Sequence, residues 1–211
     1  MNGADAVELR FPFSGRWLVQ NSPASRVPSH GTGLFGTSHA IDFVPLGADG
    51  RRARRSIASL LGTEPANIFA GFGKRVLAPV SGQVIVAVDG EEDHVARRSA
   101  FSLLSYALTQ RSRIRRGAAA IAGNHVAISA GSAIVLIAHL RAGSILVRRG
   151  QHVAAGEPIG ECGNSGNSTE PHVHVQVSES LERDARGIPL VFRHPDGRVR
   201  VPANGEIVDA G

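Results

Sequence analysis

Short apolar runs rich in valine and isoleucine recur along the chain, and glycine or proline separates most of them. Runs of about four to eight such residues between turn-forming residues are typical of β-strands. In the first half of the chain the pattern predicts strands in residues 7–13, 17–20, 40–44 and 76–88. The first two strands are expected to pair across a turn at Ser14 and Gly15. The chain is therefore expected to be a mainly β protein.

The second half of the chain repeats the pattern at the spacing of a β-meander. Glycines between the runs predict turns, and the sequence PDGR near the end predicts a hairpin. The predicted strands lie in the segments NHVAIS, AIVLIAHL, SILVRRG, HVAAGEPIGECG, PHVHVQVSE and IPLVF.

Two stretches interrupt the strand pattern with helical features. Residues 48–73 are typical of a surface insertion, with a short helix at about 53–61. Residues 95–110 place apolar side chains at helical spacing with arginines between them, which predicts an amphipathic helix. We expect this helix to pack against an edge of the sheet.

The charge of the chain comes almost wholly from arginine and is spread over many segments. The formal net charge is +5, and Lys74 is the only lysine. This scatter argues against a nucleic-acid groove, which gathers basic residues on one face. The arginine clusters within residues 51–55 and 111–116 are expected to lie on solvated helix faces. With 211 residues and 42% hydrophobic content, the chain is long enough to bury one core in one domain.

Cys162 is the sole cysteine, so the chain can form neither an internal disulfide nor a thiolate metal cage. We expect Cys162 to be a small buried filler rather than a nucleophile. No apolar run is long enough to span a membrane. Residues 1–13 lack the basic start and apolar stretch of a secretory signal, so the sequence gives no export route.

The segment PHVHVQV gives the strongest chemical signal in the chain. His172 and His174 are two residues apart in a predicted strand, so both imidazoles project from the same face. The valines Val173, Val175 and Val177 alternate onto the opposite face. The histidine face is therefore left for a cleft, where the two rings could share one metal centre.

Two further polar residues stand in apolar strands. Asp42, in HAIDF, would be costly to bury as an ion without a partner, and a metal is the natural one. His139 ends the strand VLIAHL, and taken alone it fits a satisfied core histidine equally well.

Four blocks of the sequence resemble lysostaphin and LytM-type zinc metalloendopeptidases, which hydrolyse peptidoglycan. The resemblance extends over about residues 29–179, and the blocks are APVSGQV, GNHVAI, AHL and GQHVAAGEPIGECGNSGNSTEPHVHVQV, in that order. It implies one metallopeptidase domain over residues 1–211, with insertions at about 48–73 and 91–122 and a short C-terminal extension at 183–211. The implied fold is an antiparallel β-sandwich or barrel-sandwich hybrid, the duplicated hybrid motif, with helical insertions.

The resemblance also implies roles for individual residues. His174, as the second histidine of the His-x-His pair, would bind Zn²⁺ together with Asp42. His139 and His172 would be the catalytic histidines that act on substrate and water, and the sequence leaves open which is the base and which stabilises the oxyanion. In lysostaphin-type members the remaining ligand lies four residues before the aspartate, where this chain has Ser38.

The third protein ligand must therefore come from another histidine. His39 lies three residues before Asp42, and on an extended strand it would point to the other face unless a bulge intervenes. His30 lies twelve residues before Asp42 in a glycine-rich loop that can bend back, a spacing that resembles the β-lytic metallopeptidases. We predict the set His30, Asp42 and His174, with His39 as the alternative to His30.

Two imidazoles and one carboxylate are the protein ligands of a catalytic zinc site, whose fourth position stays open for water. The expected partner is a peptidoglycan peptide, and the resemblance places such a protein in the cell envelope or outside the cell. The sequence does not determine the oligomeric state or the bond cut.

Two other functions remain to be weighed. One is a metal-free relative that binds cell-wall polymer or a protein partner without cutting it. The other is a biotinyl or lipoyl carrier domain, which APVSGQV and VRRGQHVAAGEPIG resemble. That function needs a lysine at a hairpin tip, and Lys74 instead precedes a predicted strand.

Overall fold

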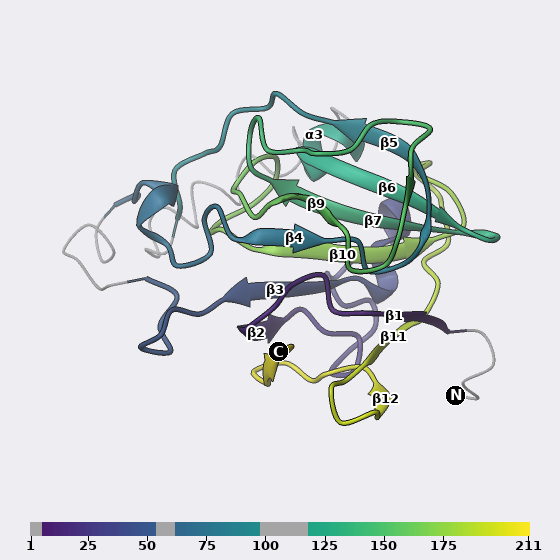
Figure 1. Cartoon of the computed structure of the whole chain (residues 1–211), viewed down its shortest axis with the longest axis horizontal. Helices are drawn as coiled ribbons and strands as arrows, with labels where there is room; N and C mark the ends of the chain where they lie inside the picture. The colour runs from purple at the N-terminus through teal and green to yellow at the C-terminus, as the bar shows by residue number, and fades with distance from the viewer. Residues whose placement is uncertain (1–5, 54–61, 98–117) are drawn as a thin grey trace.

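The computed structural model describes residues 6–53, 62–97 and 118–211. In these ranges the chain folds into three β-sheets with few helices, so the prediction of a mainly β protein is confirmed (Figure 1). The first strands are β1 (Val7–Leu9), β2 (Arg16–Gln20), β3 (Ile41–Pro45), β4 (Arg75–Leu77), β5 (Gly82–Val88), β6 (Asn124–Ala130) and β7 (Ala133–Leu140). The others are β8 (His152–Val153), β9 (Pro158–Glu161), β10 (Val173–Ser178), β11 (Leu190–Arg193), β12 (Val199–Arg200) and β13 (Ile207–Asp209). The helices are η2 (Leu34–His39), η3 (Ala66–Ile68) and α3 (Ala118–Ala122), of which η2 and η3 are 3-10 helices.

The largest sheet has eight strands in the order β13-β2-β3-β10-β7-β6-β5-β8. Every neighbouring pair in it is antiparallel. A three-stranded sheet has the order β1-β11-β12, and β4 pairs with β9 in a third sheet. The strand β10 lies in the middle of the large sheet, between β3 and β7, although long stretches of sequence separate the three.

The two faces of the large sheet have different side chains because residues alternate along each strand. On β10, Val173, Val175 and Val177 are fully buried in the main core, whereas His174 and Gln176 lie on the opposite face. The predicted division of this strand into a valine face and a histidine face is confirmed.

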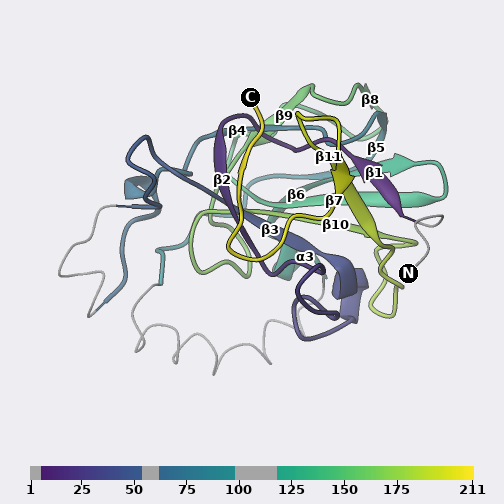
Figure 2. The same cartoon turned by 90° about the horizontal axis from the view of Figure 1, so that it is seen from below.

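The main core fills the space between the large sheet and the two small sheets. Figure 2 shows β1, β4, β9 and β11 on one side of the large sheet and α3 on the other. An aromatic cluster lies at the centre of this core, in which Phe13 stacks on Trp17 with ring centroids 4.2 Å apart. Its other members are Phe11, Phe43 and Phe192. Burying such rings is a large hydrophobic contribution, about 1.5–3 kcal/mol per large side chain.

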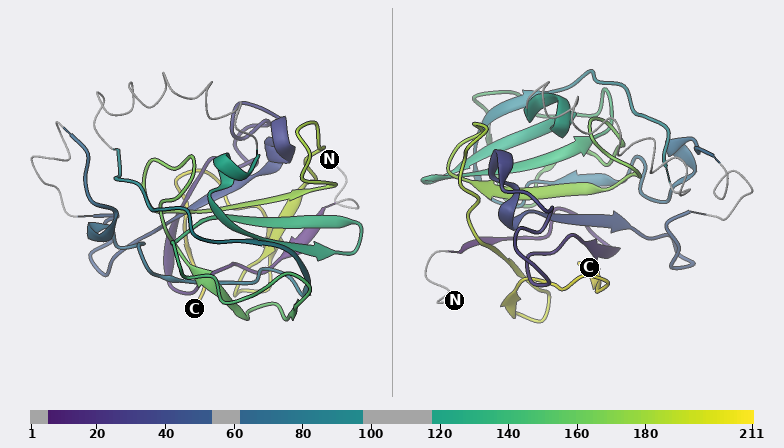
Figure 3. Two further views of the ribbon diagram at one scale, coloured as in Figure 1. Left: turned by 90° about the horizontal axis from the view of Figure 1, so that it is seen from above. Right: turned by 180° about the vertical axis from the view of Figure 1, so that it is seen from behind.

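The opposite face of the large sheet lies under α3 and η2, as seen from behind in Figure 3 (right). A smaller apolar cluster covers the part of this face formed by β6 and β7, with the buried residues Ala122, Ala127, Leu136 and Ala138. This face holds the candidate functional site.

Three predictions about individual elements are wrong or lie outside the described residues. The segments 7–13 and 17–20 do not pair, because β1 adds in parallel to β11 while β2 pairs with β3 and β13. The segment SILVRRG forms a loop instead of a strand. The predicted helices at 53–61 and 95–110 fall mostly on residues 54–61 and 98–117, which lie outside the described ranges.

The end of the chain is part of the fold. The hairpin predicted at PDGR is confirmed, since β11 and β12 pair on either side of it. The last strand, β13, pairs with β2 at the edge of the large sheet. Within the described ranges, no helix combines the length and apolar character needed to cross a membrane.

Candidate metal centre and active site

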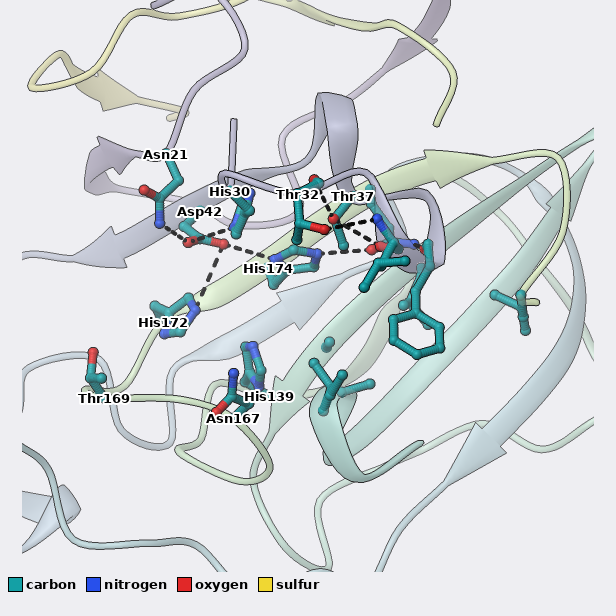
Figure 4. Close-up of a pocket in the computed structure, with 18 residues that line it drawn as sticks. Asn21, His30, Thr32, Thr37, Asp42, His139, Asn167, Thr169, His172 and His174 are labelled. Carbon is teal, nitrogen blue, oxygen red and sulfur yellow. Dashed lines mark hydrogen bonds and ion pairs between the residues drawn. The ribbon is translucent and has the colours of Figure 1, made fainter. Parts of the chain in front are cut away.

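A cavity of about 520 Å³ opens on the face of the large sheet beside η2 and α3. Its walls come from the end of β2, the loop and helix before β3, the strands β3, β7 and β10, and the loops around them (Figure 4). The polar lining residues are Asn21, His30, Thr32, Thr37, Asp42, His139, Asn167, Thr169, His172, His174 and Gln176. The apolar ones are Leu34, Phe35, Ile121, Ala122, Leu136, Ala138 and Leu181.

Three of these residues converge so closely that they could hold one metal ion. Ligand atoms of His30, Asp42 and His174 all lie within 4.8 Å of one another. The Nε2 atom of His30 is 3.1 Å from Oδ2 of Asp42, and Nδ1 of His174 is 2.9 Å from Oδ1. Sheet register explains the second contact, because Asp42 on β3 lies directly opposite His174 on β10.

The loop before η2 brings His30 to Asp42. Ser29 closes this loop, since its backbone N–H donates to Ser38 O at 3.0 Å and its hydroxyl donates to Thr37 O at 3.2 Å. The same hydroxyl oxygen lies 3.0 Å from Nδ1 of His30 and can accept its proton. The ring is thereby fixed with Nε2 toward Asp42. The alternative residue, His39, ends η2 and does not line the cavity.

Asp42 is buried, with 5% of its surface exposed, among groups that favour its charge. Burial alone would raise the pKa of this carboxyl. The nearby rings of His30 and His172, and hydrogen bonds from His174 and His30, outweigh burial and hold its pKa well below the usual range. Asn21 adds a neutral donor, with Nδ2 2.7 Å from Oδ2. The carboxylate is therefore ionised over the physiological pH range.

The donor set fits a zinc ion. Imidazole nitrogen and carboxylate oxygen are common zinc ligands, and three protein ligands are typical of catalytic sites. A buried carboxylate that faces several imidazoles also needs positive charge beside it, either protons or a cation. The arrangement of His30, Asp42 and His174 can therefore bind a divalent metal.

His172 lies beside this group but is held differently. Its Nδ1 donates to the backbone oxygen of Glu170 at 2.8 Å and lies 3.0 Å from the hydroxyl of Ser168. That hydroxyl also donates to Glu170 O. Its Nε2 is 3.7 Å from Oδ1 of Asp42, on the side of the cavity (Figure 4). The backbone oxygen therefore fixes the tautomer and leaves Nε2 available for chemistry.

His139 enters the cavity through an irregularity in β7. Ala138 lies opposite His174, so strict alternation would point His139 to the other face. At this point the register of β6 and β7 shifts, and His125 lies opposite both Ala138 and His139. His139 has a positive φ of 63°, which turns its side chain to the cavity. Such strained residues cluster at functional sites.

The ring of His139 lies next to that of His172, with centroids 4.6 Å apart. Its Nδ1 donates to the backbone oxygen of Ser165 at 3.0 Å. Burial, together with the rings of His172 and His174, lowers the pKa of His139 well below its usual value, against the opposing effects of Asp42 and the Ser165 carbonyl. The ring is therefore a neutral imidazole with Nε2 free to accept a proton.

Close backbone packing holds Ser165 in place. A Cβ at Gly123 would lie 2.5 Å from the backbone nitrogen of Gly166, and one at Gly166 would lie 2.4 Å from that of Gly123, so only glycine fits at either position. The hydroxyl of Ser165 accepts from Asn124 N at 3.0 Å and donates to Leu140 O at 2.8 Å. The segments GNH (residues 123–125) and GNSG (residues 163–166) thus pack against each other next to His139.

All five residues predicted for the site line one cavity, and the sequence missed several that orient them. The missed residues are Asn21, Ser29, Ser165, Ser168 and Gln176. A signal existed for Gln176, because it continues the histidine face of β10 two residues after His174. The others lie in loops or at strand ends, where spacing gives no indication of direction.

The other residues that stood out in the sequence lie outside the cavity. Cys162 is fully buried in the main core, and burial raises the pKa of its thiol far above the usual value, so the buried filler is confirmed. Lys74 donates to Leu46 O at 2.9 Å. Arg52, which was expected on a solvated helix face, instead forms an ion pair with Glu170, so the insertion contacts the segment that holds His172.

Comparison with known proteins identifies the family. The model of peptidase family M23 matches residues 64–189, more than half of the chain. The chain therefore belongs to peptidase family M23. The matched residues include His139, His172 and His174, whereas His30 and Asp42 precede them.

Individual relatives match more weakly. A segment of 56 residues is 41% identical to the peptidoglycan DD-endopeptidase ShyA of Vibrio cholerae, and it covers 26% of this chain and 13% of ShyA. The catalytic domain of the prophage-encoded M23 protein EnpA from Enterococcus faecalis is 18% identical, with a TM-score of 0.46 over 85% of this chain and 93% of that domain. The catalytic domain of lysostaphin from Staphylococcus simulans is 20% identical, with a TM-score of 0.39 over 74% of this chain and 80% of that domain.

Proposed function

We propose that this chain is a zinc-dependent metalloendopeptidase that hydrolyses peptide bonds of bacterial peptidoglycan. The observation that supports this most directly is the convergence of His30, Asp42 and His174 beside two further histidines in one cavity. Membership of family M23 supports the reaction class. The DD-endopeptidase to which a segment of the chain is similar supports the substrate class.

In this proposal His30, Asp42 and His174 hold the zinc ion. When bound, zinc acts as a Lewis acid that lowers the pKa of water and polarises a peptide carbonyl. Asp42 is already ionised, and both histidines are held with one nitrogen toward it. The protein therefore directs a carboxylate and two imidazole nitrogens at one point, as a metal site requires.

In the same proposal, His139 and His172 are the catalytic residues. Each ring is held through Nδ1 by a backbone oxygen, so Nε2 is the atom at which protons are exchanged. One ring takes a proton from the attacking water, and the other, once protonated, donates to the developing oxyanion or to the leaving amine. Groups of this kind typically contribute about 10²- to 10⁴-fold in rate.

The cavity also has an apolar side away from the histidines. Leu34, Phe35, Ile121, Leu136 and Leu181 line it. We propose that an apolar part of the peptide, such as an alanine methyl or a longer aliphatic chain, packs there while the scissile bond lies between the two histidine pairs. The place of action would be where peptidoglycan is, in the cell envelope or outside the cell.

Metal analysis combined with hydrolysis of purified peptidoglycan tests the proposal. We expect about one zinc per chain, loss of turbidity of the peptidoglycan suspension, and release of new amino groups. A chelator should abolish hydrolysis, and added zinc should restore it. A protein that binds peptidoglycan without releasing amino groups would instead support an inactive relative, with or without bound metal. An active protein that contains no zinc would contradict the proposed ligand set.

A further inference from the structure

Gln176 lies on β10 on the same face as His174 and lines the cavity. Only 3% of its surface is exposed, so both ends of its amide require partners. The carbonyl end, Oε1, lies 3.0 Å from Nε2 of His174. The amino end, Nε2, donates to the backbone oxygen of Phe35 at 2.8 Å. The side chain thus connects a candidate metal ligand to η2.

The Phe35 oxygen determines which way the amide points. A backbone oxygen can only accept, so it must face the amino end of Gln176. The carbonyl end is then presented to His174, and a carbonyl also can only accept. When Nδ1 binds a metal ion, the single ring proton of His174 must therefore be on Nε2, and the lone pair of Nδ1 is directed at the candidate metal position.

The Phe35 oxygen is itself fixed in direction. The residue has a positive φ of 57°, and its N–H donates to the backbone oxygen of Arg183 at 2.8 Å. The neighbouring Gly36 packs directly on β10, because a Cβ there would lie 2.6 Å from Cβ of Ser178. The acceptor for Gln176 is therefore part of a rigid contact between η2 and β10.

We propose that Gln176 is a positioning residue that selects Nδ1 of His174 as the metal-binding nitrogen. It does so by accepting the Nε2 proton while η2 holds its amide in one orientation. The inference rests on the proposed zinc site. Because η2 follows the loop that carries His30, the Gln176 amide connects the segment that holds His30 to the strand that holds His174.

Three variants of the 211-residue chain test this role. Gln176→Leu keeps the size of the side chain but removes both hydrogen bonds. Gln176→Glu keeps an acceptor for His174 and loses the donor to Phe35. Gln83→Leu is the matched control, because Gln83 also donates to a backbone oxygen, that of Gly150 at 3.2 Å, but lies on β5 outside the cavity.

We expect Gln176→Leu to weaken zinc binding, measured by competition with a chromophoric chelator, by about 10- to 100-fold. Gln176→Glu should recover most of that affinity, and Gln83→Leu should match wild type. Long-range ¹H–¹⁵N spectra of histidine-labelled, zinc-loaded protein should show the His174 proton on Nε2 in wild type and in Gln176→Glu. In Gln176→Leu that proton should exchange faster with water.

Two results would overturn the inference while leaving the zinc site standing. One is a Gln176→Leu protein that binds zinc as tightly as wild type. The other is a zinc-loaded wild-type protein in which the His174 proton is on Nδ1. If Gln176→Leu does not fold, the Gln176→Glu spectra decide between the two tautomers. A wild-type protein that binds no zinc would contradict the proposed function itself and, with it, the role of Gln176 in selecting the metal-binding nitrogen.

Discussion

The cavity contains two pairs of histidines that are equally close but are anchored in different ways. His30 and His174 have ring centroids 4.8 Å apart, and His139 and His172 have them 4.6 Å apart. Each ring of the first pair points one nitrogen at Asp42 and is anchored at the other nitrogen by a side chain. Each ring of the second pair is anchored at Nδ1 by a backbone oxygen.

The difference shows how one side-chain type can serve two purposes in one cavity. A ring whose free nitrogen faces an ionised carboxylate is suited to bind a cation. A ring whose free nitrogen lies farther from the carboxylate, as Nε2 of His172 does at 3.7 Å from Oδ1 of Asp42, is suited to exchange protons. The partner of the anchored nitrogen decides between them, because it fixes both the tautomer and the direction of the ring. The predictions below separate the pairs, beginning with the largest effect.

Removing a member of the first pair, or the carboxylate between them, should remove the metal. We expect His30→Ala and Asp42→Ala each to lose bound zinc, and hydrolysis should fall by about 10³-fold or more because the Lewis acid is lost. His39→Ala is the control and should keep most of both, since His39 does not line the cavity. Zinc content of the purified variants measures the effect. Loss with His39→Ala and retention with His30→Ala would exchange the two histidines in the ligand set.

Removing a member of the second pair should spare the metal and stop turnover. We expect His139→Ala and His172→Ala to lower kcat by about 10²- to 10⁴-fold while retaining zinc. Peptide hydrolysis by the zinc-loaded variants gives kcat, and chelator competition gives the metal affinity. If His172→Ala lost metal as fully as His174→Ala, the division into two pairs would be wrong.

Two serines that hydrogen-bond to the histidines allow the two pairs to be compared through smaller changes in zinc binding and kcat. Ser29 anchors His30, and Ser168 anchors His172. Removal of one hydrogen bond costs about 1 kcal/mol, which corresponds to about a fivefold change. We therefore expect Ser29→Ala to weaken zinc binding about fivefold, and Ser168→Ala to lower kcat about fivefold with zinc binding unchanged. Equal effects of both serines on metal affinity would contradict separate roles.

The smallest expected effect is a change in the pH dependence of stability, and it comes from a buried histidine outside the cavity. His194 packs edge-on against Phe11, and burial, assisted by Arg200, lowers its pKa despite the opposing charge of Glu206. The unfolded chain then binds a proton at a higher pH than the folded one, so this residue lowers stability as pH falls below about 6.5. His194→Phe should make the denaturation midpoint less sensitive to pH between about 7 and 5. An unchanged pH dependence would show that His194 titrates alike in both states.

Several features of the site could be predicted from the sequence because strand geometry has a fixed period. Alternation placed His172 and His174 on one face and the intervening valines in the core. An aspartate within an apolar strand indicated a buried charge that needs a partner, and the structure places Asp42 opposite His174. The glycine-rich loop allowed His30 to reach this aspartate from twelve residues away.

Other features depend on contacts between distant segments, which period and spacing do not describe. His139 faces the cavity because a bulge and a positive φ reverse the expected alternation. The parallel pairing of β1 with β11 replaced the expected hairpin, since the apolar side chains of residues 7–13 fill the core between two sheets. Ser165 orients His139 from 26 residues away, and the amide of Gln176, which contacts the nearby His174, is held by the backbone oxygen of Phe35, 141 residues away.

The sequence by itself determined the class of fold, the residue types of the candidate metal centre and the strand faces on which most of them lie. Local chain geometry is enough for these, because alternation and turn preference act over a few residues. The tertiary structure alone decided which nitrogen of each ring is free and toward what it points. That choice depends on the acceptors which the folded chain brings beside each histidine, and so it separates two rings anchored by side chains from two rings anchored by backbone oxygens in one cavity.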